Sequence, residues 1–177
     1  HVSSMQPGEA HKTALHEYFV QVKDLPALII DIRGNGGGSD QVWMEYIVGQ
    51  LAAETVSGRV GVACRAGDLV QDYVRAGWGS EPAWVPVLDL VSTDPQAAAN
   101  LPEELRGDEF VGVLPVDWRV KPQRDSIGYP GKVFLLVDNG IYSSSESFAA
   151  FAKASGWATL VGGCTGGDGI GMTPALL

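Results

Sequence analysis

The sequence is poor in the residues on which disulfide scaffolds and metal sites depend. Cysteine occurs twice in 177 residues, at Cys64 and Cys164, and histidine occurs three times. Two cysteines so far apart cannot form a disulfide framework, and they leave the redox compartment undecided. No group of His, Cys, Asp or Glu has the spacing of metal ligands, so we expect neither a metal nor another cofactor.

Positive charge and long apolar runs are also scarce. The chain has 12 basic and 21 acidic residues, which gives a formal net charge of −9. Nucleic acids and anionic lipid surfaces bind clustered Lys and Arg, so neither is expected as a partner. The longest apolar runs, such as residues 133–137, have about five residues, whereas a membrane span needs about 20. No signal peptide is visible.

The composition indicates one folded domain over residues 1–177. Hydrophobic residues make up 45% and charged residues 19%, a balance that excludes intrinsic disorder. The length fits one domain better than two. The chain begins at His1 and ends at the apolar Leu177, whereas natural ends are usually polar. We therefore expect this domain to be a fragment of a longer protein.

Glycine is abundant, with 23 residues, and it marks two strand–turn–helix units. The first unit has a helix at 9–23, a buried parallel strand at 27–31 covered on both faces, the turn 33–38 and a second helix. That second helix places Trp43, Ile47 and Leu51 on one face and could be capped by Ser39 or Asp40.

The second unit has a strand at 132–137, a helix from 143 to about 154, a strand at 158–161 and the glycine-rich stretch 162–169. Repetition of this pattern predicts an α/β core with parallel strands and a site at their carboxyl ends.

Residues 66–130 lie between the two units and are less regular. They are rich in proline and tryptophan and follow a predicted strand at 59–64. Their one predicted helix is short, near 102–105. A segment this long without clear structure is usually a lid, a binding loop or an interface.

The glycine turn is the first candidate for chemistry. Gly36, Gly37 and Gly38 follow Asp31 at a strand end, where successive N–H groups can form a nest for an anion or an oxyanion. The stretch is not a phosphate loop, because no Gly-Lys-Ser/Thr follows it. A plain tight turn is the alternative.

The second candidate is Ser143-Ser144-Ser145-Glu146 at the start of a helix. The helix dipole stabilises negative charge there, and the N–H after a nucleophilic serine can act as an oxyanion donor. The alternative is a capping box, in which Ser143 and Glu146 only satisfy free N–H groups of the first turn. His11 and His16 are interpreted as solvent-exposed helix residues.

Together, the two units resemble the carboxyl-terminal processing (tail-specific) serine peptidases, whose relatives include the tricorn core proteases and the interphotoreceptor retinoid-binding modules. The resemblance rests on residues 28–38, 131–137, 143–146 and 158–167 and covers about 1–60 and 130–177. It implies a crotonase/ClpP-like core of repeated β-β-α units, often accompanied by a PDZ domain. It also implies Ser143 as the nucleophile, with the N–H groups of Ser144 and Gly37 as oxyanion donors. Gly36, Gly38, Glu146 and Asp168 would support them.

One departure concerns the general base. Processing peptidases of this family carry a lysine where this chain has Asp168. The tricorn-like branch lacks that lysine and uses a His/Ser pair from an earlier segment with a later Glu. The base would then lie outside residues 1–177, and we expect the isolated chain to be inactive.

We therefore expect a serine endopeptidase core acting on peptides or proteins. A catalytically silent peptide- or ligand-binding module on the same fold is the main alternative, and an acyl-CoA-type enzyme on the same core is a third. The resemblance implies a further amino-terminal region, which could include a PDZ domain, and it favours a location outside the cytoplasm. An oligomer is compatible with the sequence.

Overall fold

The computed structural model describes residues 1–65, 67–78, 83–93, 103–106 and 109–167. The described residues form two compact units, one made of His1–Arg59 with residues 117–167, and the other of Val60–Val116. The elements in chain order are α1 (Glu9–Val22), β1 (Ala27–Asp31), η1 (Val42–Val48), α2 (Gly49–Leu51), β2 (Val56–Arg65), α3 (Asp68–Trp78), α4 (Val87–Thr93), η2 (Glu103–Arg106), β3 (Phe110–Val120), β4 (Lys132–Val137), α6 (Ser144–Ser155) and β5 (Thr159–Gly162).

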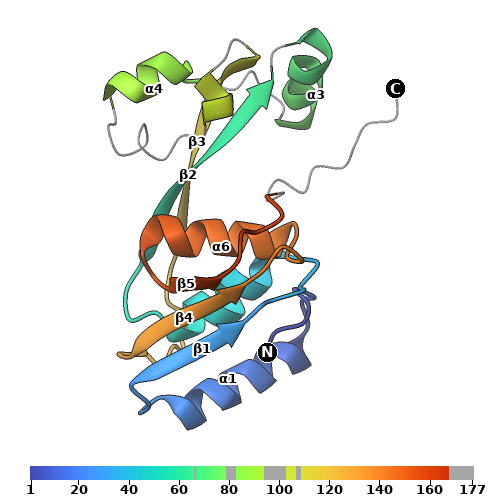
Figure 1. Ribbon diagram of the computed structural model, residues 1–177. Helices are drawn as coiled ribbons and strands as arrows, with labels where there is room; N and C mark the ends of the chain where they lie inside the picture. The colour runs from blue at the N-terminus through green and yellow to red at the C-terminus, as the bar shows by residue number, and fades with distance from the viewer. Residues whose placement is uncertain (66, 79–82, 94–102, 107–108, 168–177) are drawn as a thin grey trace. The chain divides into compact units, whose positions relative to one another are not determined.

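The first unit is built on a three-stranded sheet in the order β1-β4-β5 (Figure 1). Both pairings are parallel, with Asp31 opposite Leu136 and Leu136 opposite Val161. The carboxyl ends of all three strands therefore lie at one edge of the sheet. This confirms the predicted α/β class with a parallel sheet.

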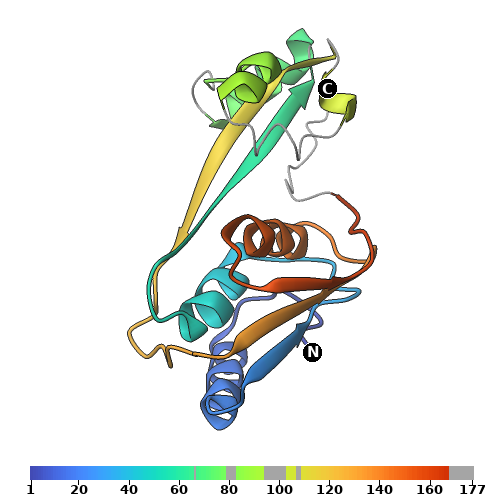
Figure 2. The same cartoon turned by 60° about the vertical axis from the view of Figure 1, so that its left-hand side comes forward.

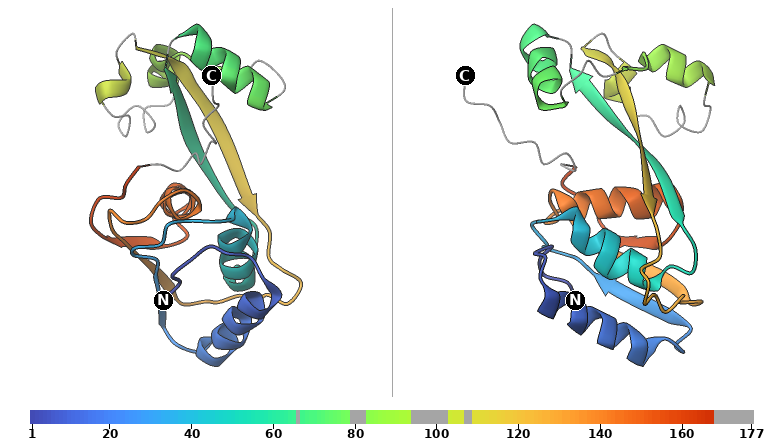
Figure 3. Two further views of the ribbon diagram at one scale, coloured as in Figure 1. Left: turned by 90° about the vertical axis from the view of Figure 1, so that its right-hand side faces the viewer. Right: turned by 180° about the vertical axis from the view of Figure 1, so that it is seen from behind.

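Helices cover one face of this sheet. Figure 2 and the rear view in Figure 3 show α1, the continuous η1–α2 helix and α6 on the same side. Leu28, Ile30 and Leu135 point toward this side and are buried, whereas Ile29 is 62% exposed. The prediction of strands buried on both faces is therefore wrong for the described residues. Burial alternates along β1 because successive side chains point to opposite faces.

Aromatic rings fill the layer between the helices. Trp43 of η1 stacks on Phe148 of α6 with ring centroids 5.6 Å apart, and the centroid of the Phe151 ring lies 5.0 Å from that of Trp43. Trp43, Ile47 and Leu51 are all buried, as their spacing predicted. The packing of η1 on α6 fixes the position of the α6 amino terminus, where Ser143 lies.

The middle of the chain is more regular than predicted. Helices α3, α4 and η2 and the long strand β3 fall within residues 66–130, and β3 pairs with β2 in a two-stranded sheet. Pro115 lies within β3, which pairs with β2 on one edge and, through Val113, forms an isolated bridge with Val85. Proline is tolerated in such an edge strand because it lacks only one N–H. Residues 117–167 belong to the first unit, where Trp118 packs 5.6 Å from Trp43.

An ion pair shapes the carboxyl end of β1. The Arg33 guanidinium donates two hydrogen bonds to the Asp31 carboxylate, each at 2.9 Å, and the Arg33 N–H adds a third at 3.1 Å. These bonds lower the pKa of Asp31 to about 2, and the carboxylate raises the pKa of Arg33 in turn. The pair fixes the backbone where β1 turns into the glycine-rich segment.

None of the described helices has the length and apolar character needed to cross a membrane.

Truncating Phe148 tests the aromatic layer. Phe148→Ala should lower the free energy of unfolding by about 3–5 kcal/mol, because it removes a fully buried ring and leaves a cavity beside Trp43. Urea unfolding followed by circular dichroism measures the effect. Leu25→Ala is the control, since Leu25 is 52% exposed. An equal loss in the two variants would contradict the central role of this layer.

The Asp31–Arg33 pair predicts a pH dependence of stability. The pKa of Asp31 is lower in the folded protein, about 2, than its ordinary value of 3.8. The ionised carboxylate therefore stabilises the fold above pH 3.8, and this contribution is lost as the pH falls from 3.8 to about 2. A carboxyl titration by NMR should give the low pKa, and Arg33→Gln should return it toward 3.8. An unchanged titration in Arg33→Gln would show that Arg33 is not the cause.

Candidate active site

Ser143 stands between β4 and α6 in a strained backbone conformation. Its φ of 54° and ψ of −121° make it the one non-glycine residue with positive φ among the described residues. Such a conformation costs about 1–3 kcal/mol and is retained where the surroundings enforce it, often at a functional site. A strained serine at a strand-to-helix turn is also the arrangement that exposes a nucleophilic hydroxyl.

The capping alternative is not supported by the contacts of Ser143 and Glu146. Ser143 occupies the N-cap position of α6, but its side chain makes no capping hydrogen bond. The Glu146 carboxylate accepts a hydrogen bond from the Thr165 hydroxyl. Because neither half of a capping box is formed, Ser143 does not serve to satisfy the first turn of the helix.

The turn after β1 lies directly against the turn after β4. Asp138 accepts hydrogen bonds from Gly34 N–H at 2.9 Å and from Gly140 N–H at 3.0 Å. Tyr142 N–H donates to the Asn35 carbonyl at 3.1 Å. The glycine turn and Ser143 therefore meet at the carboxyl edge of the sheet, as their positions in the two sequence units predicted.

Gly37 makes the closest approach to Ser143. A Cβ placed on Gly37 would lie 2.8 Å from Ser143 Cβ and 2.6 Å from the Tyr142 carbonyl oxygen. Its φ of 92° is also unfavourable for a residue with a side chain. Only glycine fits this contact, so the plain-turn alternative leaves this position unexplained.

The N–H of Gly37 already has an acceptor. It donates to Asn35 Oδ1 at 2.9 Å, and the Gly37 carbonyl accepts Met5 N–H at 3.0 Å. The Gly37 carbonyl thus faces the amino-terminal segment, and so does the Ser39 N–H, which donates to the Met5 carbonyl at 2.7 Å. The role of Gly37 as an oxyanion donor stays a prediction. To bind an oxyanion, the Gly37 N–H would have to break its hydrogen bond to Asn35 Oδ1 or donate to both acceptors.

Gly38 lies between these two residues, in a parallel bridge with Met5. The Gly37 carbonyl binds Met5, and the N–H of the same trans peptide points the opposite way, so the Gly38 N–H points away from Met5. The amino-terminal segment pairs with the outer edge of β1 through Val2, whereas β4 lies on the inner edge. The Gly38 N–H therefore points away from the amino-terminal segment.

Ser144 is the first residue of α6, and its N–H has no acceptor among the described residues. The N–H groups of a first helical turn lack partners within the helix and carry partial positive charge. The side-chain hydroxyls of Ser144 and Ser145 are buried without a hydrogen-bond partner. The Ser144 N–H and the glycine turn thus border Ser143 from two sides.

The loop after β5 forms the third side of the site. Thr165 binds Glu146, whose other carboxylate oxygen is buried without a partner. A Cβ on Gly166 would lie 3.1 Å from the Ile141 carbonyl oxygen, in the turn before Ser143. This loop leads to Asp168, which lies outside the described residues.

Each of the three histidines has a polar contact with a group other than Ser143. His1 Nε2 lies 3.5 Å from the Arg33 carbonyl, and His11 Nδ1 lies 3.0 Å from the Gln6 carbonyl. His16 Nδ1 lies 2.7 Å from Oε1 of the buried Gln50. His11 and His16 are half-buried, so the prediction that they are solvent-exposed is wrong. Within the described part of the chain, no group of His, Cys, Asp and Glu could hold a metal ion.

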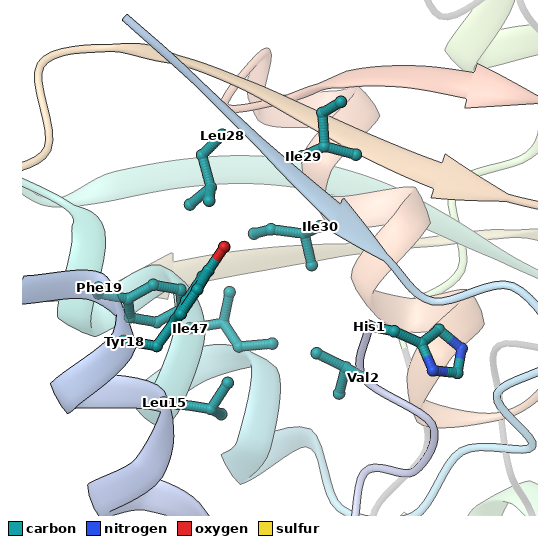
Figure 4. A pocket seen from close by; sticks show the side chains of 9 residues that line it. All are labelled: His1, Val2, Leu15, Tyr18, Phe19, Leu28, Ile29, Ile30 and Ile47. Carbon is teal, nitrogen blue, oxygen red and sulfur yellow. The ribbon is translucent and has the colours of Figure 1, made fainter. Parts of the chain in front are cut away.

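An apolar pocket of about 180 Å³ lies elsewhere, between α1 and β1 (Figure 4). Side chains of both elements, including Tyr18, Phe19 and Leu28, line it, and Ile47 of η1 closes its floor. Its lining includes neither Ser143 nor the glycine turn, so it belongs to the packing of α1 on the sheet.

Three residues that organise the site were missed by the sequence analysis, namely Asn35, Asp138 and Thr165. Asn35 stands among glycines, and the turn was interpreted through its backbone N–H groups, without a role for the Asn35 side chain. Asp138 begins an Asp-Asn-Gly turn, and the tendency of Asp to bind nearby backbone N–H groups could have identified it. Thr165 had no local signal, because its partner Glu146 is 19 residues away.

Comparisons with known proteins agree with this arrangement. The model of Peptidase family S41 matches residues 1–177. No match was found among curated protein sequences.

Three solved structures are similar in fold. The first is a putative peptidase from Parabacteroides merdae, with 18% identity, a TM-score of 0.55 and coverage of 94% of this chain and 39% of that one. Mature CPAF has 15% identity, a TM-score of 0.57 and coverage of 94% and 37%. The photosystem II D1 C-terminal processing protease has 15% identity, a TM-score of 0.50 and coverage of 94% and 30%.

The chain thus spans between 30% and 39% of the length of these three proteins, and at such identities the likeness shows the fold. The family model, by contrast, matches the chain from its first residue to its last. The resemblance of the two strand–turn–helix units to processing peptidases is confirmed, and the chain belongs to peptidase family S41.

Proposed function

We propose that this chain is the catalytic core of a serine peptidase in which Ser143 is the nucleophile. The observation that carries the proposal is the strained, half-buried Ser143, whose side chain caps nothing and which abuts the glycine turn. A binding module would gain nothing from this strain, whereas a nucleophile gains exposure of its hydroxyl. Family membership supports the same class of reaction.

The reaction proceeds by acyl transfer. The Ser143 hydroxyl adds to a peptide carbonyl carbon while a general base takes its proton, and the carbonyl oxygen becomes an oxyanion. The carbon–nitrogen bond then breaks, and the base returns the proton to the leaving amine. Water hydrolyses the resulting ester in the same way, which releases the acid and restores the hydroxyl.

Two backbone N–H groups would stabilise the oxyanion. The Ser144 N–H has no other acceptor and carries the positive end of the helix dipole. The second donor comes from the glycine turn, as expected. The direction of the peptide groups favours Gly38 over Gly37, because the Gly37 hydrogen is bound to Asn35. Gly36 and Gly37 then serve by letting the turn pass close to Ser143.

The general base is proposed to come from outside residues 1–177. The described histidines bind other groups, and the position of the family's lysine is Asp168. An ionised carboxylate is a weak base for a serine hydroxyl at neutral pH. This supports, as a proposal, a base of the kind that the tricorn-like branch uses, with residues from an earlier segment and a later Glu. The amino-terminal region implied by the resemblance would supply part of them.

Peptides or proteins are the proposed substrates. One structural neighbour is a C-terminal processing protease, and we extend cleavage near a carboxyl terminus to this chain as a proposal. The choice between that specificity and broader endopeptidase activity depends on parts of the protein that bind substrate away from Ser143.

Two substitutions at Ser143 separate a nucleophile from a structural residue. Ser143→Ala should abolish hydrolysis and fluorophosphonate labelling while changing the free energy of unfolding by less than about 1–2 kcal/mol. Ser143→Gly should be equally inactive but more stable by roughly 1 kcal/mol, because glycine adopts positive φ without strain. Labelling in the longest encoded form of the protein and urea unfolding provide the two measurements.

Ser145→Ala is the matched control, because Ser145 is a buried serine two residues away whose hydroxyl has no hydrogen-bond partner among the described residues. It should keep the labelling of the parent protein. Labelling that survives in Ser143→Ala would contradict the assignment and move it to Ser144 or Ser145.

The position of the base gives a separate prediction. The isolated 177-residue chain should show no Ser143-dependent peptide hydrolysis, because no described residue gives its serine a base within hydrogen-bond reach. Restoring the encoded flanking sequence should restore turnover. Hydrolysis by the isolated chain that is lost in Ser143→Ala would show that a base lies within these residues. Asp168, His11 and His16 would then be substituted first.

A further inference from the structure

Asn35 is a fully buried polar residue at the centre of the glycine turn. Its side-chain Nδ2 donates to the Val2 carbonyl at 2.8 Å, and its Oδ1 accepts the Gly37 N–H at 2.9 Å. Its backbone N–H donates to the Ile32 carbonyl at 3.0 Å, and its carbonyl accepts the Tyr142 N–H at 3.1 Å. One residue thus joins the amino-terminal segment, the glycine turn and the segment that leads into Ser143.

The partners fix the orientation of the Asn35 amide. Val2 offers a carbonyl, which only the NH₂ group can satisfy, and Gly37 offers an N–H, which only the oxygen can accept. Exchanging the two ends would place donor against donor and acceptor against acceptor. The amide therefore has one stable position, and that position determines where the Gly37 hydrogen points.

This bond decides which peptide groups of the turn are available to a substrate. The Asn35 bond fixes the Gly36–Gly37 peptide group, and the Met5 N–H fixes the Gly37–Gly38 peptide group by binding the Gly37 carbonyl. In that trans peptide the Gly38 N–H points opposite to the Gly37 carbonyl, and so away from Met5. Gly37 and Gly38 have φ values of 92° and 143°, so the turn has conformational freedom that only its contacts remove. Asn35 supplies the side-chain contact that does so.

We infer that Asn35 is a positioning residue for the oxyanion hole, an inference that rests on the proposed serine peptidase function. Asn35 holds the Gly37 N–H directly, and through the Val2 carbonyl it holds the segment whose Met5 binds the Gly37 carbonyl. It thereby orients the peptide groups on both sides of Gly37, so that the turn presents a preorganised donor beside Ser143. Asn35 touches no reacting atom and acts through the backbone of Gly37 and Gly38. Its bond to the Val2 carbonyl makes residues 1–5 part of the same support.

Burial makes this arrangement hard to undo. Releasing the Gly37 N–H would leave Asn35 Oδ1 buried without a donor, a loss that proteins rarely tolerate. The bond is therefore a fixed part of the site, and it keeps the turn from reorganising when negative charge develops. Donors that need no reorganisation are the ones that stabilise a transition state most.

The experiment compares Asn35→Ala and Asn35→Asp with the matched control Ser126→Ala, all in the longest encoded form of the protein. The Ser126 hydroxyl also bridges backbone groups, with contacts of 3.0 Å to the Gln50 carbonyl and 2.6 Å to the Ala52 carbonyl. Ser126 precedes β4, whereas Ser143 follows β4. Ser126→Ala therefore removes side-chain hydrogen bonds comparable to those of Asn35, but at the end of β4 opposite to Ser143. Circular dichroism and urea unfolding establish that each variant is folded.

Asn35→Ala should lower kcat for peptide hydrolysis roughly 10²–10³-fold, as loss of an oxyanion donor does. KM should change by less than about threefold, because the donor acts mainly in the transition state. Asn35→Asp can still accept the Gly37 hydrogen but cannot donate to Val2 when ionised. Its kcat relative to that of the parent should recover on acidification, since a protonated carboxyl both donates and accepts. Ser126→Ala should retain kcat within about twofold.

A fall in kcat for Asn35→Ala no greater than for Ser126→Ala would overturn the positioning role while leaving Ser143 as the nucleophile. An effect on KM alone would overturn it as well. A parent protein that shows neither hydrolysis nor fluorophosphonate labelling dependent on Ser143 would instead overturn the proposed function, and the role of Asn35 with it.

Discussion

The parallel pairing of β1 with β4 is the constraint on which the site depends. With Asp31 opposite Leu136, the two strands end at the same edge of the sheet, and the chain leaves each of them in a turn. Asp138 then binds an N–H from each turn, so segments more than 100 residues apart are joined by one carboxylate. A register shift of one residue would turn the buried side chains of β1 to the other face, so packing specifies this alignment strongly.

The aromatic layer behind the sheet holds the strain at Ser143. The α6 helix cannot rotate or slide to relax its first residue, because Phe148 and Phe151 are fully buried against Trp43. The same packing buries the hydroxyls of Ser144 and Ser145 without partners, which costs stability. Strain and unpaired polar groups thus gather at the start of one helix, and the core supplies the free energy that offsets them.

Much of the fold could be predicted from local patterns. The strands at 27–31 and 132–137 and the buried face of Trp43, Ile47 and Leu51 follow from short apolar runs and helical spacing. The prediction of an irregular segment at 66–130 failed, because the proline-rich composition of this segment did not prevent the pairing of β3 with β2, even with Pro115 inside β3. It also failed for the sheet face that carries Ile29, because an apolar run alone does not show which of its residues a helix will cover.

The sequence by itself determined which residues could do chemistry, since glycines after a strand and serines at a helix start are local features. Tertiary structure decided what each of them does. Ser143 and Glu146 match a capping box in sequence, yet Glu146 binds Thr165 and Ser143 caps nothing. Gly37 and Gly38 are the same residue type, yet the Gly37 N–H is bound by the buried Asn35 amide, whereas the Gly38 N–H points away from Met5. The physical reason is that a hydrogen bond has a direction and a partner, and a long-range partner is fixed only when the chain is folded.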